Sequence, residues 1–161
     1  MSDDLLEVRL GELLGQRGLT LAVAESCTGG LVGHRITNVA GSSTYFVGGV
    51  ISYANEAKMN LLGVRGETLV NFGAVSRETV LEMARGVRRA LNADVGLAVS
   101  GIAGPGGGTP DKPVGTVWIG LCTPDKEQAW SYRLQGERIQ IKQQAAERAL
   151  HHLAEYLDGA G

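Results

Sequence analysis

The most suggestive chemical group in the sequence is the hydroxyl of Ser26, within the segment AESCTGG at residues 24–30. A short apolar stretch at 20–24 predicts a buried strand before it, and the apolar residues that follow predict a helix. Ser26 is therefore expected at the mouth of a helix, where several backbone N–H groups lack partners. The amides of Cys27, Thr28, Gly29 and Gly30 could then stabilise the oxyanion that a serine nucleophile creates. From position alone, a simpler role as the helix cap remains open for this serine.

Other nucleophiles and bases are less well placed. Cys27 is a rival nucleophile, but no histidine lies near it in the sequence, and a small buried thiol is the alternative interpretation. His34 falls about two turns into the predicted helix. His151 and His152 lie in the last predicted helix, where a surface or helix-end role is expected. The sequence therefore does not support a Ser-His-Asp triad.

Lysine is the alternative base, and Lys58 ends the segment SYANEAK at residues 52–58, just after a predicted strand. The end of that strand could lie beside the Ser26 turn. A lysine base must first lose its proton, because at a reference pKa of about 10.4 only about one molecule in 2,000 is deprotonated at pH 7. Tyr53 could relay a proton or hold the lysine. An exposed helix lysine and a sheet-edge tyrosine are the alternatives.

Two further segments have ligand-binding character. Glycine is densest between Gly101 and Gly115, where flexible amides could wrap a polar ligand and Lys112 could add charge. This loop lacks a Gly-Lys-Ser or Gly-Lys-Thr ending, so it matches neither the P-loop nor the dinucleotide fingerprint. The segment GSST at 41–44 offers hydroxyls and amides of the kind that hold phosphate, and a simple turn is the alternative.

The elements that would position these residues alternate between strands and helices. Helices are predicted over 3–17, after Ser26, over 55–62, after an N-cap at Ser76 and over 139–157. Strands are predicted over 20–24, 46–52, 95–100, 116–122 and 128–134, with a turn or a single-turn helix at 68–73 and a hairpin turn at 124–127. This order predicts an α/β fold of three layers, α/β/α, with a mixed sheet covered by helices on both faces.

Length and composition limit the function classes. The chain has 161 residues, an ordinary length for a single domain over 1–161. Its formal charge of −2 argues against sequence-independent binding of nucleic acid, which requires an excess of Lys and Arg. The two cysteines fit no CxxC spacing and are typical of a reducing cytoplasm. Since we find no secretory signal and no apolar run near the ~18 residues of a membrane span, we expect a cytoplasmic protein without membrane association.

Six motifs occur together in the order found in the CinA C-terminal domain family, and the sequence resembles that family over roughly residues 5–157. They are AESCTGG at 24–30, AGSS at 40–43, SYANEAK at 52–58, GAVS at 73–76, VSGIAGPGG at 99–107 and KPVGTV at 112–117. The resemblance implies a stand-alone amidohydrolase that converts nicotinamide mononucleotide to nicotinate mononucleotide and ammonia, for NAD recycling, without a metal or an organic cofactor. It assigns the nucleophile to Ser26, assisted by Tyr53 and Lys58.

The expected ligand is thus a small-molecule nucleotide, and we expect a homodimer or higher homo-oligomer. The predicted substrate-binding residues are Cys27, Thr28, Gly29, Gly30, Ser42, Ser43, Asn55, Gly101, Ala103, Gly104 and Arg138. Two other functions remain open. The chain could be a catalytically silent nucleotide-binding or regulatory module, or an amidase for another small carboxamide, because specificity would reside in the loops.

Overall fold

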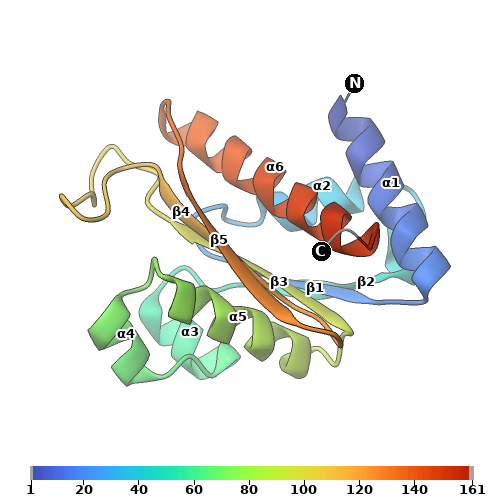
Figure 1. Ribbon diagram of the computed structural model, residues 1–161, viewed down its shortest axis with the longest axis horizontal. Helices are drawn as coiled ribbons and strands as arrows, with labels where there is room; N and C mark the ends of the chain where they lie inside the picture. Colours follow the sequence, from blue (N-terminus) through green and yellow to red (C-terminus); the bar gives the residue numbers. More distant parts are fainter. Residues whose placement is uncertain (1, 160–161) are drawn as a thin grey trace.

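In the computed structural model, which describes residues 2–159, a five-stranded sheet is covered by helices on both faces (Figure 1). The strand order is β2-β1-β3-β4-β5. The strands are β1 (Leu21–Glu25), β2 (Phe46–Ile51), β3 (Val95–Gly101), β4 (Thr116–Cys122) and β5 (Glu127–Arg133). β1 is parallel to β2 and β3, whereas β4 is antiparallel to β3 and β5. The predicted α/β fold with a mixed sheet is confirmed; Met1, Ala160 and Gly161 of the predicted domain lie outside the described residues.

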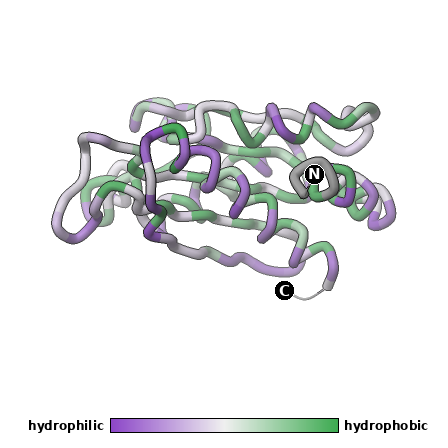
Figure 2. Tube along the Cα trace, turned by 90° about the horizontal axis from the view of Figure 1, so that it is seen from above, coloured by the Kyte–Doolittle hydropathy of each residue, from purple (hydrophilic) through white to green (hydrophobic). Residues whose placement is uncertain are grey.

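The helices divide between the two faces of the sheet (Figure 1). One face carries α1 (Ser2–Arg17), α2 (Leu31–Thr37) and α6 (Arg138–Leu157), and the other carries α3 (Asn55–Leu62), α4 (Gly66–Phe72) and α5 (Arg77–Ala90). Hydrophilic and hydrophobic residues alternate along the traces of these helices, as expected for helices that bury one side (Figure 2). The predicted N-cap of α5 is confirmed, because the Ser76 hydroxyl accepts from the Thr79 N–H at 3.1 Å.

Local boundaries differ from the prediction at a few places. The segment at 68–73 is predicted as a turn or a single-turn helix. Residues 68–72 belong to the seven-residue helix α4, and Gly73 is its C-cap. The GSST segment contains a short 3₁₀ helix, η1 (Ser42–Thr44). Glu127, predicted in the hairpin turn, is the first residue of β5, where its carboxylate pairs with Arg85 of α5 at 2.7 Å. These shifts of one to three residues do not change the order of the elements.

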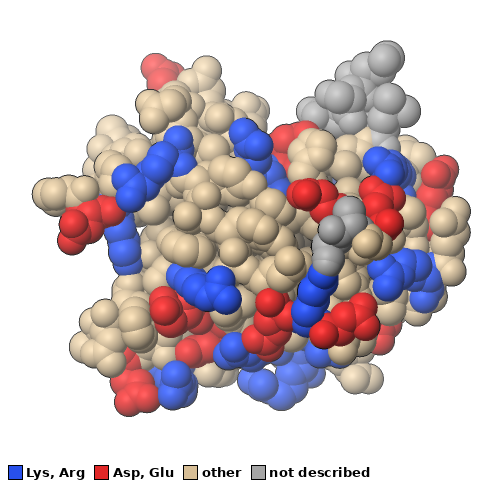
Figure 3. All heavy atoms as spheres, viewed as in Figure 1, with Lys and Arg blue, Asp and Glu red and all other residues tan. Residues whose placement is uncertain are grey.

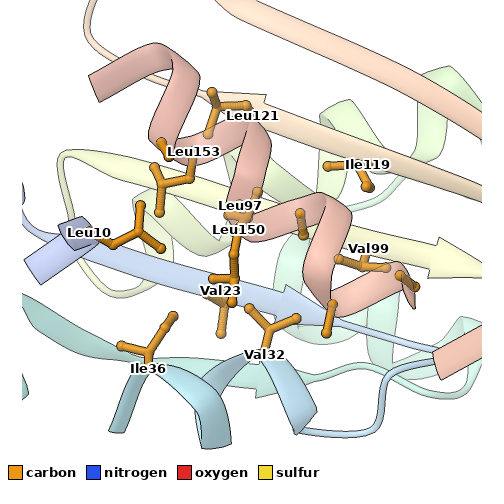
Figure 4. Packing of buried hydrophobic residues seen from close by; sticks show 14 of the residues in the cluster. Leu10, Val23, Val32, Ile36, Leu97, Val99, Ile119, Leu121, Leu150 and Leu153 are labelled. Carbon is orange, nitrogen blue, oxygen red and sulfur yellow. The ribbon is translucent and has the colours of Figure 1, made fainter. Parts of the chain in front are cut away.

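Two clusters of buried apolar side chains hold the layers together. On the α6 side, Leu10, Leu150 and Leu153 lie over Val23 and Leu97 of the sheet (Figure 4). The other cluster joins α3 and α5 to the opposite face through Leu62, Val80, Met83, Ala84, Val87, Ala22, Ala24 and Ala98. Because both faces of β1 and β3 are buried, the ends of these strands are held in fixed positions.

The surface is mixed in charge. On the face in Figure 3, Lys and Arg side chains are interspersed with Asp and Glu. An anionic ligand on this face must therefore be held by a local arrangement of groups. Within residues 2–159, no helix combines the length and the apolar character needed to cross a membrane.

Candidate active site

The carboxyl ends of β1, β2 and β3 meet at one edge of the sheet. Ser26 directly follows β1, and its backbone N–H donates to the Val99 carbonyl of β3 at 3.0 Å. The N–H of Ser52, which follows β2, donates to the Glu25 carbonyl at 2.8 Å. These bonds hold Ser26 among neighbouring strand ends, which is where open α/β sheets place their ligands.

Residues 26–30 form a tight turn that precedes α2. The N-cap of α2 is Gly30, in the left-handed region with φ 108°, so the interpretation of Ser26 as the helix cap is wrong. The amides of Gly29 and Gly30 are already bonded, to the Ser26 carbonyl at 3.1 Å and to Glu25 Oε1 at 3.1 Å. Among the described residues, the N–H groups of Cys27 and Thr28 donate to no carbonyl or carboxylate. These two amides are the ones left to meet an oxyanion.

The start of α2 is capped from β1 by the carboxylate of Glu25, which is 2% exposed. Its Oε1 accepts from the Thr28 hydroxyl at 2.6 Å and from the amides of Gly30 and Val32 at 3.1 and 3.0 Å. Its Oε2 accepts from the Gly33 amide at 2.9 Å. A buried carboxylate requires such donors, and the positive end of a helix favours its charge. This carboxylate therefore ties the Ser26 turn to the start of α2.

Lys58 projects from α3 into the same site and is 1% exposed. Its Nζ lies 3.0 Å from Ser26 Oγ, 2.7 Å from the Ser52 carbonyl oxygen and 3.3 Å from the Tyr53 carbonyl oxygen. No carboxylate is among its partners in the described part of the chain. A lysine held in this way is a candidate base rather than half of an ion pair.

Burial weakens the hold of Lys58 on its proton. Burial lowers the pKa of Lys58 below its ordinary value of 10.5, because the interior disfavours the ammonium form. A thiolate at Cys27 would oppose this effect, but burial raises the pKa of that thiol to about 12 and keeps it protonated near neutral pH. Cys27 thus matches the interpretation of a buried thiol, and the Ser26 hydroxyl is left as the candidate nucleophile beside Lys58.

A pocket of about 200 Å³ opens beside Ser26 and Lys58. Arg138, the first residue of α6, is an exposed part of its wall. Its Nη1 donates to the Gly104 carbonyl at 2.7 Å and its Nη2 donates to the Tyr53 hydroxyl at 3.0 Å. This guanidinium therefore joins the start of α6 to the glycine-rich loop and to the segment before α3. Tyr53 makes no side-chain hydrogen bond to Ser26 or Lys58 among the described residues.

The sequence matches the family model of the CinA C-terminal domain over residues 3–157. The chain belongs to this family. Among solved structures, a competence/damage inducible protein, CihA, from Agrobacterium tumefaciens is 39% identical with a TM-score of 0.94, covering 98% of this chain and 96% of that one. A CinA superfamily protein from Klebsiella pneumoniae 700603 is 35% identical with a TM-score of 0.94, covering 99% of each chain.

Curated relatives of this CinA C-terminal domain are longer. A CinA-like protein of Kosmotoga olearia is 50% identical over 150 residues, which cover 93% of this chain and 36% of that protein. A CinA-like protein of Acaryochloris marina is 51% identical over 157 residues, which cover 96% of this chain and 38% of that protein. The chain thus spans little more than a third of the length of the curated relatives that it matches.

Most residues predicted for the site of this CinA domain come together. Thr28, Gly29 and Gly30 continue the turn after Ser26, and Gly104 contacts Arg138 through its carbonyl. Lys112, expected to add charge near the glycine-rich loop, instead donates to the Phe72 carbonyl at 2.5 Å. The predicted residues that line the pocket itself are Ser26, Cys27, Tyr53, Asn55, Lys58, Gly101, Ala103 and Arg138.

Ser42 and Ser43 lie near the amino-terminal ends of β1 and β2, opposite the strand ends that carry Ser26 and Ser52. The helix η1 precedes β2, and the carbonyl of Tyr45 accepts from the Leu21 N–H at 2.8 Å at the start of β1. Because β1 and β2 are parallel, their starts are one strand length away from the ends that carry Ser26 and Ser52. Within one chain the GSST segment is therefore not brought to the pocket, and we leave it out of the proposed site.

None of the three histidines lines the pocket beside Ser26. The expected surface role is confirmed for His151, whose side chain is 56% exposed and pairs with Glu147. It is wrong for His152, which is buried, stacks on Trp130 with ring centroids 3.8 Å apart and hydrogen-bonds to Tyr132. The physical reason is that β5 packs over this side of α6, which the helical pattern alone does not reveal.

Sequence reasoning missed two polar residues that shape the site. The first is Glu25, for which an acid directly after four apolar strand residues is a usable signal of a buried carboxylate. Ser100, at the end of β3, is 1% exposed, lines the pocket and donates from its hydroxyl to the Ala74 carbonyl at 2.8 Å. That bond fixes the segment before α5 against the site.

Proposed function

We propose that the chain is an amidohydrolase in which Ser26 attacks a carboxamide carbon and Lys58 accepts its proton. The substrate we propose is nicotinamide mononucleotide, which is hydrolysed to nicotinate mononucleotide and ammonia. The observation that carries the proposal is the 3.0 Å separation between Lys58 Nζ and Ser26 Oγ, with the lysine 1% exposed. A serine needs a base within hydrogen-bond reach, and this lysine meets that requirement.

The surroundings of Lys58 accommodate both the ammonium and the neutral amine that the reaction requires. A neutral amine has two N–H groups and one lone pair, whereas an ammonium has three N–H groups and no acceptor. The carbonyls of Ser52 and Tyr53 accept two hydrogens from Nζ. As an ammonium, Lys58 donates its third hydrogen to Ser26 Oγ along the 3.0 Å contact. In the neutral amine the lone pair faces this oxygen instead, and the Ser26 hydroxyl can donate its proton to Nζ. The lowered pKa of the lysine makes this neutral form easier to reach.

The reaction has two halves. In the first, the bond from Ser26 Oγ to the carboxamide carbon forms while the hydroxyl proton moves to Lys58. The amides of Cys27 and Thr28 are available to stabilise the resulting oxyanion, and each such donor can contribute about 3 kcal/mol. Lys58 then returns the proton to the departing nitrogen, the C–N bond breaks and ammonia leaves. In the second half, water attacks the ester carbon while Lys58 accepts one of its protons. The bond from the carbon to Ser26 Oγ then breaks, Lys58 returns the proton to Ser26 Oγ, and the acid leaves as its carboxylate with its own proton lost to solvent.

We assign Tyr53 a supporting part in this reaction. Its carbonyl holds Lys58 and its hydroxyl accepts from Arg138 at 3.0 Å. Both contacts position neighbouring groups, and neither places the phenol on the path of the proton.

We also retain the prediction of a homodimer or higher homo-oligomer, which sedimentation measures directly.

A panel of carboxamides tests the proposed function. Ammonia release is measured for the wild-type chain with nicotinamide mononucleotide, nicotinamide riboside, nicotinamide and glutamine. The proposal predicts the highest kcat/KM for the mononucleotide, with nicotinate mononucleotide formed in equal amount. Faster turnover of another member of the panel would identify a different amidase. Binding of the mononucleotide without ammonia release would identify a catalytically silent nucleotide-binding module.

A further inference from the structure

A second cation lies close to the nucleophile turn. Lys142 is one helical turn after Arg138 on α6, and its side chain is half-buried. Its Nζ lies 3.7 Å from the position that a Cβ atom would take on Gly29. Residues four apart on a helix lie on one side of it, so Arg138 and Lys142 approach the pocket together.

The charge of Lys142 has no acidic partner in the part of the chain whose side chains are described. Arg35 of α2, another partly buried cation on this face of the sheet, is bound by Glu7 at 2.6 Å and Glu147 at 2.8 Å. Burial raises the pKa of the Cys27 thiol, whereas the positive charge of Lys142 lowers it. The charge of Lys142 therefore acts on a residue of the Ser26 turn. A cation without a partner beside a ligand pocket is placed to meet an anion.

Arg138 has spare capacity for the same anion. A guanidinium carries five N–H donors, and the carbonyl of Gly104 and the hydroxyl of Tyr53 accept one each. Its contacts with the pocket wall fix its position, which lowers the entropy that binding a ligand would cost.

The pocket itself is too small for a whole nucleotide. Its volume of about 200 Å³ is below the roughly 300 to 1,000 Å³ that is usual for a small-molecule site. An aromatic carboxamide fits beside Ser26 and Lys58, and the remainder of a nucleotide must extend over the rim. Arg138 carries positive charge in the pocket wall, and Lys142 adds a second positive charge above Gly29. Lys112, near Gly73, is held by the Phe72 carbonyl.

We propose that Lys142, together with Arg138, binds the phosphate monoester of the substrate and thereby selects a phosphorylated nucleotide over its riboside. This inference rests on the proposed function for the identity of the ligand, but it concerns binding and is tested separately from turnover. Lys142 acts as a specificity residue that touches the phosphate, with no part in proton transfer.

The test is the affinity of the chain for nicotinamide mononucleotide and for nicotinamide riboside, measured by titration calorimetry on the Ser26→Ala protein, which prevents turnover. Adding Lys142→Gln should weaken binding of the mononucleotide by about tenfold or more, because a charge-assisted contact is lost. The affinity for the riboside should change by less than about twofold. Lys142→Arg should retain most of the affinity for the mononucleotide. Added salt should weaken binding of the mononucleotide and leave binding of the riboside unchanged.

The matched control is Lys126→Gln, which removes the same charge from the turn between β4 and β5, far from the pocket edge of the sheet. Thermal melting of each variant checks folding. Equal weakening of both ligands, or no change beyond that of the Lys126 control, would overturn the assignment of Lys142. No detectable binding of the mononucleotide would also overturn it. If Lys142→Gln weakens binding of the mononucleotide but the wild-type chain releases no ammonia, the assignment of Lys142 to the phosphate is supported and the proposed hydrolysis is rejected.

Discussion

Lys58 Nζ lies 3.0 Å from Ser26 Oγ, although the two residues are 32 positions apart in the sequence. The parallel pairing of β1 with β2 explains the contact, because Glu25 is opposite Ile51 and the two chains therefore leave the sheet side by side. After β2, the first turn of α3 directs Lys58 back under the Ser26 turn. The sheet register thus sets the distance between the proposed nucleophile and its base.

Replacing the lysine tests its role as the base. Lys58→Met keeps the apolar stem and removes the amine, so kcat should fall by about 10²- to 10⁴-fold, the usual contribution of a general base. The measurement is ammonia release from nicotinamide mononucleotide, with Lys126→Met as the matched control. A Lys58→Met protein that melts like the wild type and retains its activity would remove the lysine from the mechanism.

The pH dependence follows from the lowered pKa of Lys58. Only the neutral amine can accept the Ser26 proton, so kcat/KM should rise with pH and level off above an apparent pKa below 10.5. In the unfolded chain the lysine titrates at its ordinary pKa, so between the two values the unfolded state binds more protons. The free energy of unfolding should therefore increase with pH across that window. A pH profile that falls over the same range would contradict the assignment of a neutral base.

The carboxylate of Glu25 should matter for both stability and activity. Glu25→Ala leaves four donors without their acceptor, which should lower the free energy of unfolding by about 3 kcal/mol. Urea unfolding measures the change, and Glu12→Ala, on an exposed position of α1, should cost less than about 0.5 kcal/mol. If Glu25→Ala does not fold, Glu25→Gln retains the shape and removes the charge. A cost no larger than that of the Glu12 control would show that Glu25 does not secure the turn.

The hydroxyl of Tyr53 should influence binding more than chemistry. Tyr53→Phe removes the acceptor of Arg138 Nη2, so KM should rise by about two- to tenfold while kcat changes little. Arg138→Gln should raise KM as well, and the double variant should show less than the sum of the two effects, because the two residues share one contact. A loss in kcat at constant KM would instead assign Tyr53 to proton transfer.

The order of the elements could be predicted because strand ends and helix starts can be inferred from local patterns. These patterns left Lys58 open to interpretation as an exposed helix lysine, and its pairing with Ser26 was predicted from the resemblance to the CinA family. Turn geometry could not be inferred in the same way, so Ser26 was open to interpretation as the helix cap, whereas Gly30 is the N-cap and the carboxylate of Glu25 accepts from the first amides of α2. The distance of Ser42 and Ser43 from the pocket depends on the direction of β2 relative to β1, which is a property of the sheet. The burial of His152 and the position of Lys142 depend on how α6 is rotated against its neighbours, which helical periodicity leaves unresolved.

The most direct test of the central claim is the rate of ammonia release from nicotinamide mononucleotide by the wild-type, Ser26→Ala and Ser131→Ala proteins. Ser131 is an exposed serine of β5 and serves as the matched control. With the Ser26 hydroxyl as the nucleophile, kcat of Ser26→Ala should fall by more than about 10³-fold, while Ser131→Ala should retain wild-type activity. Ammonia release by a folded Ser26→Ala protein at a rate near that of the wild type would contradict the account.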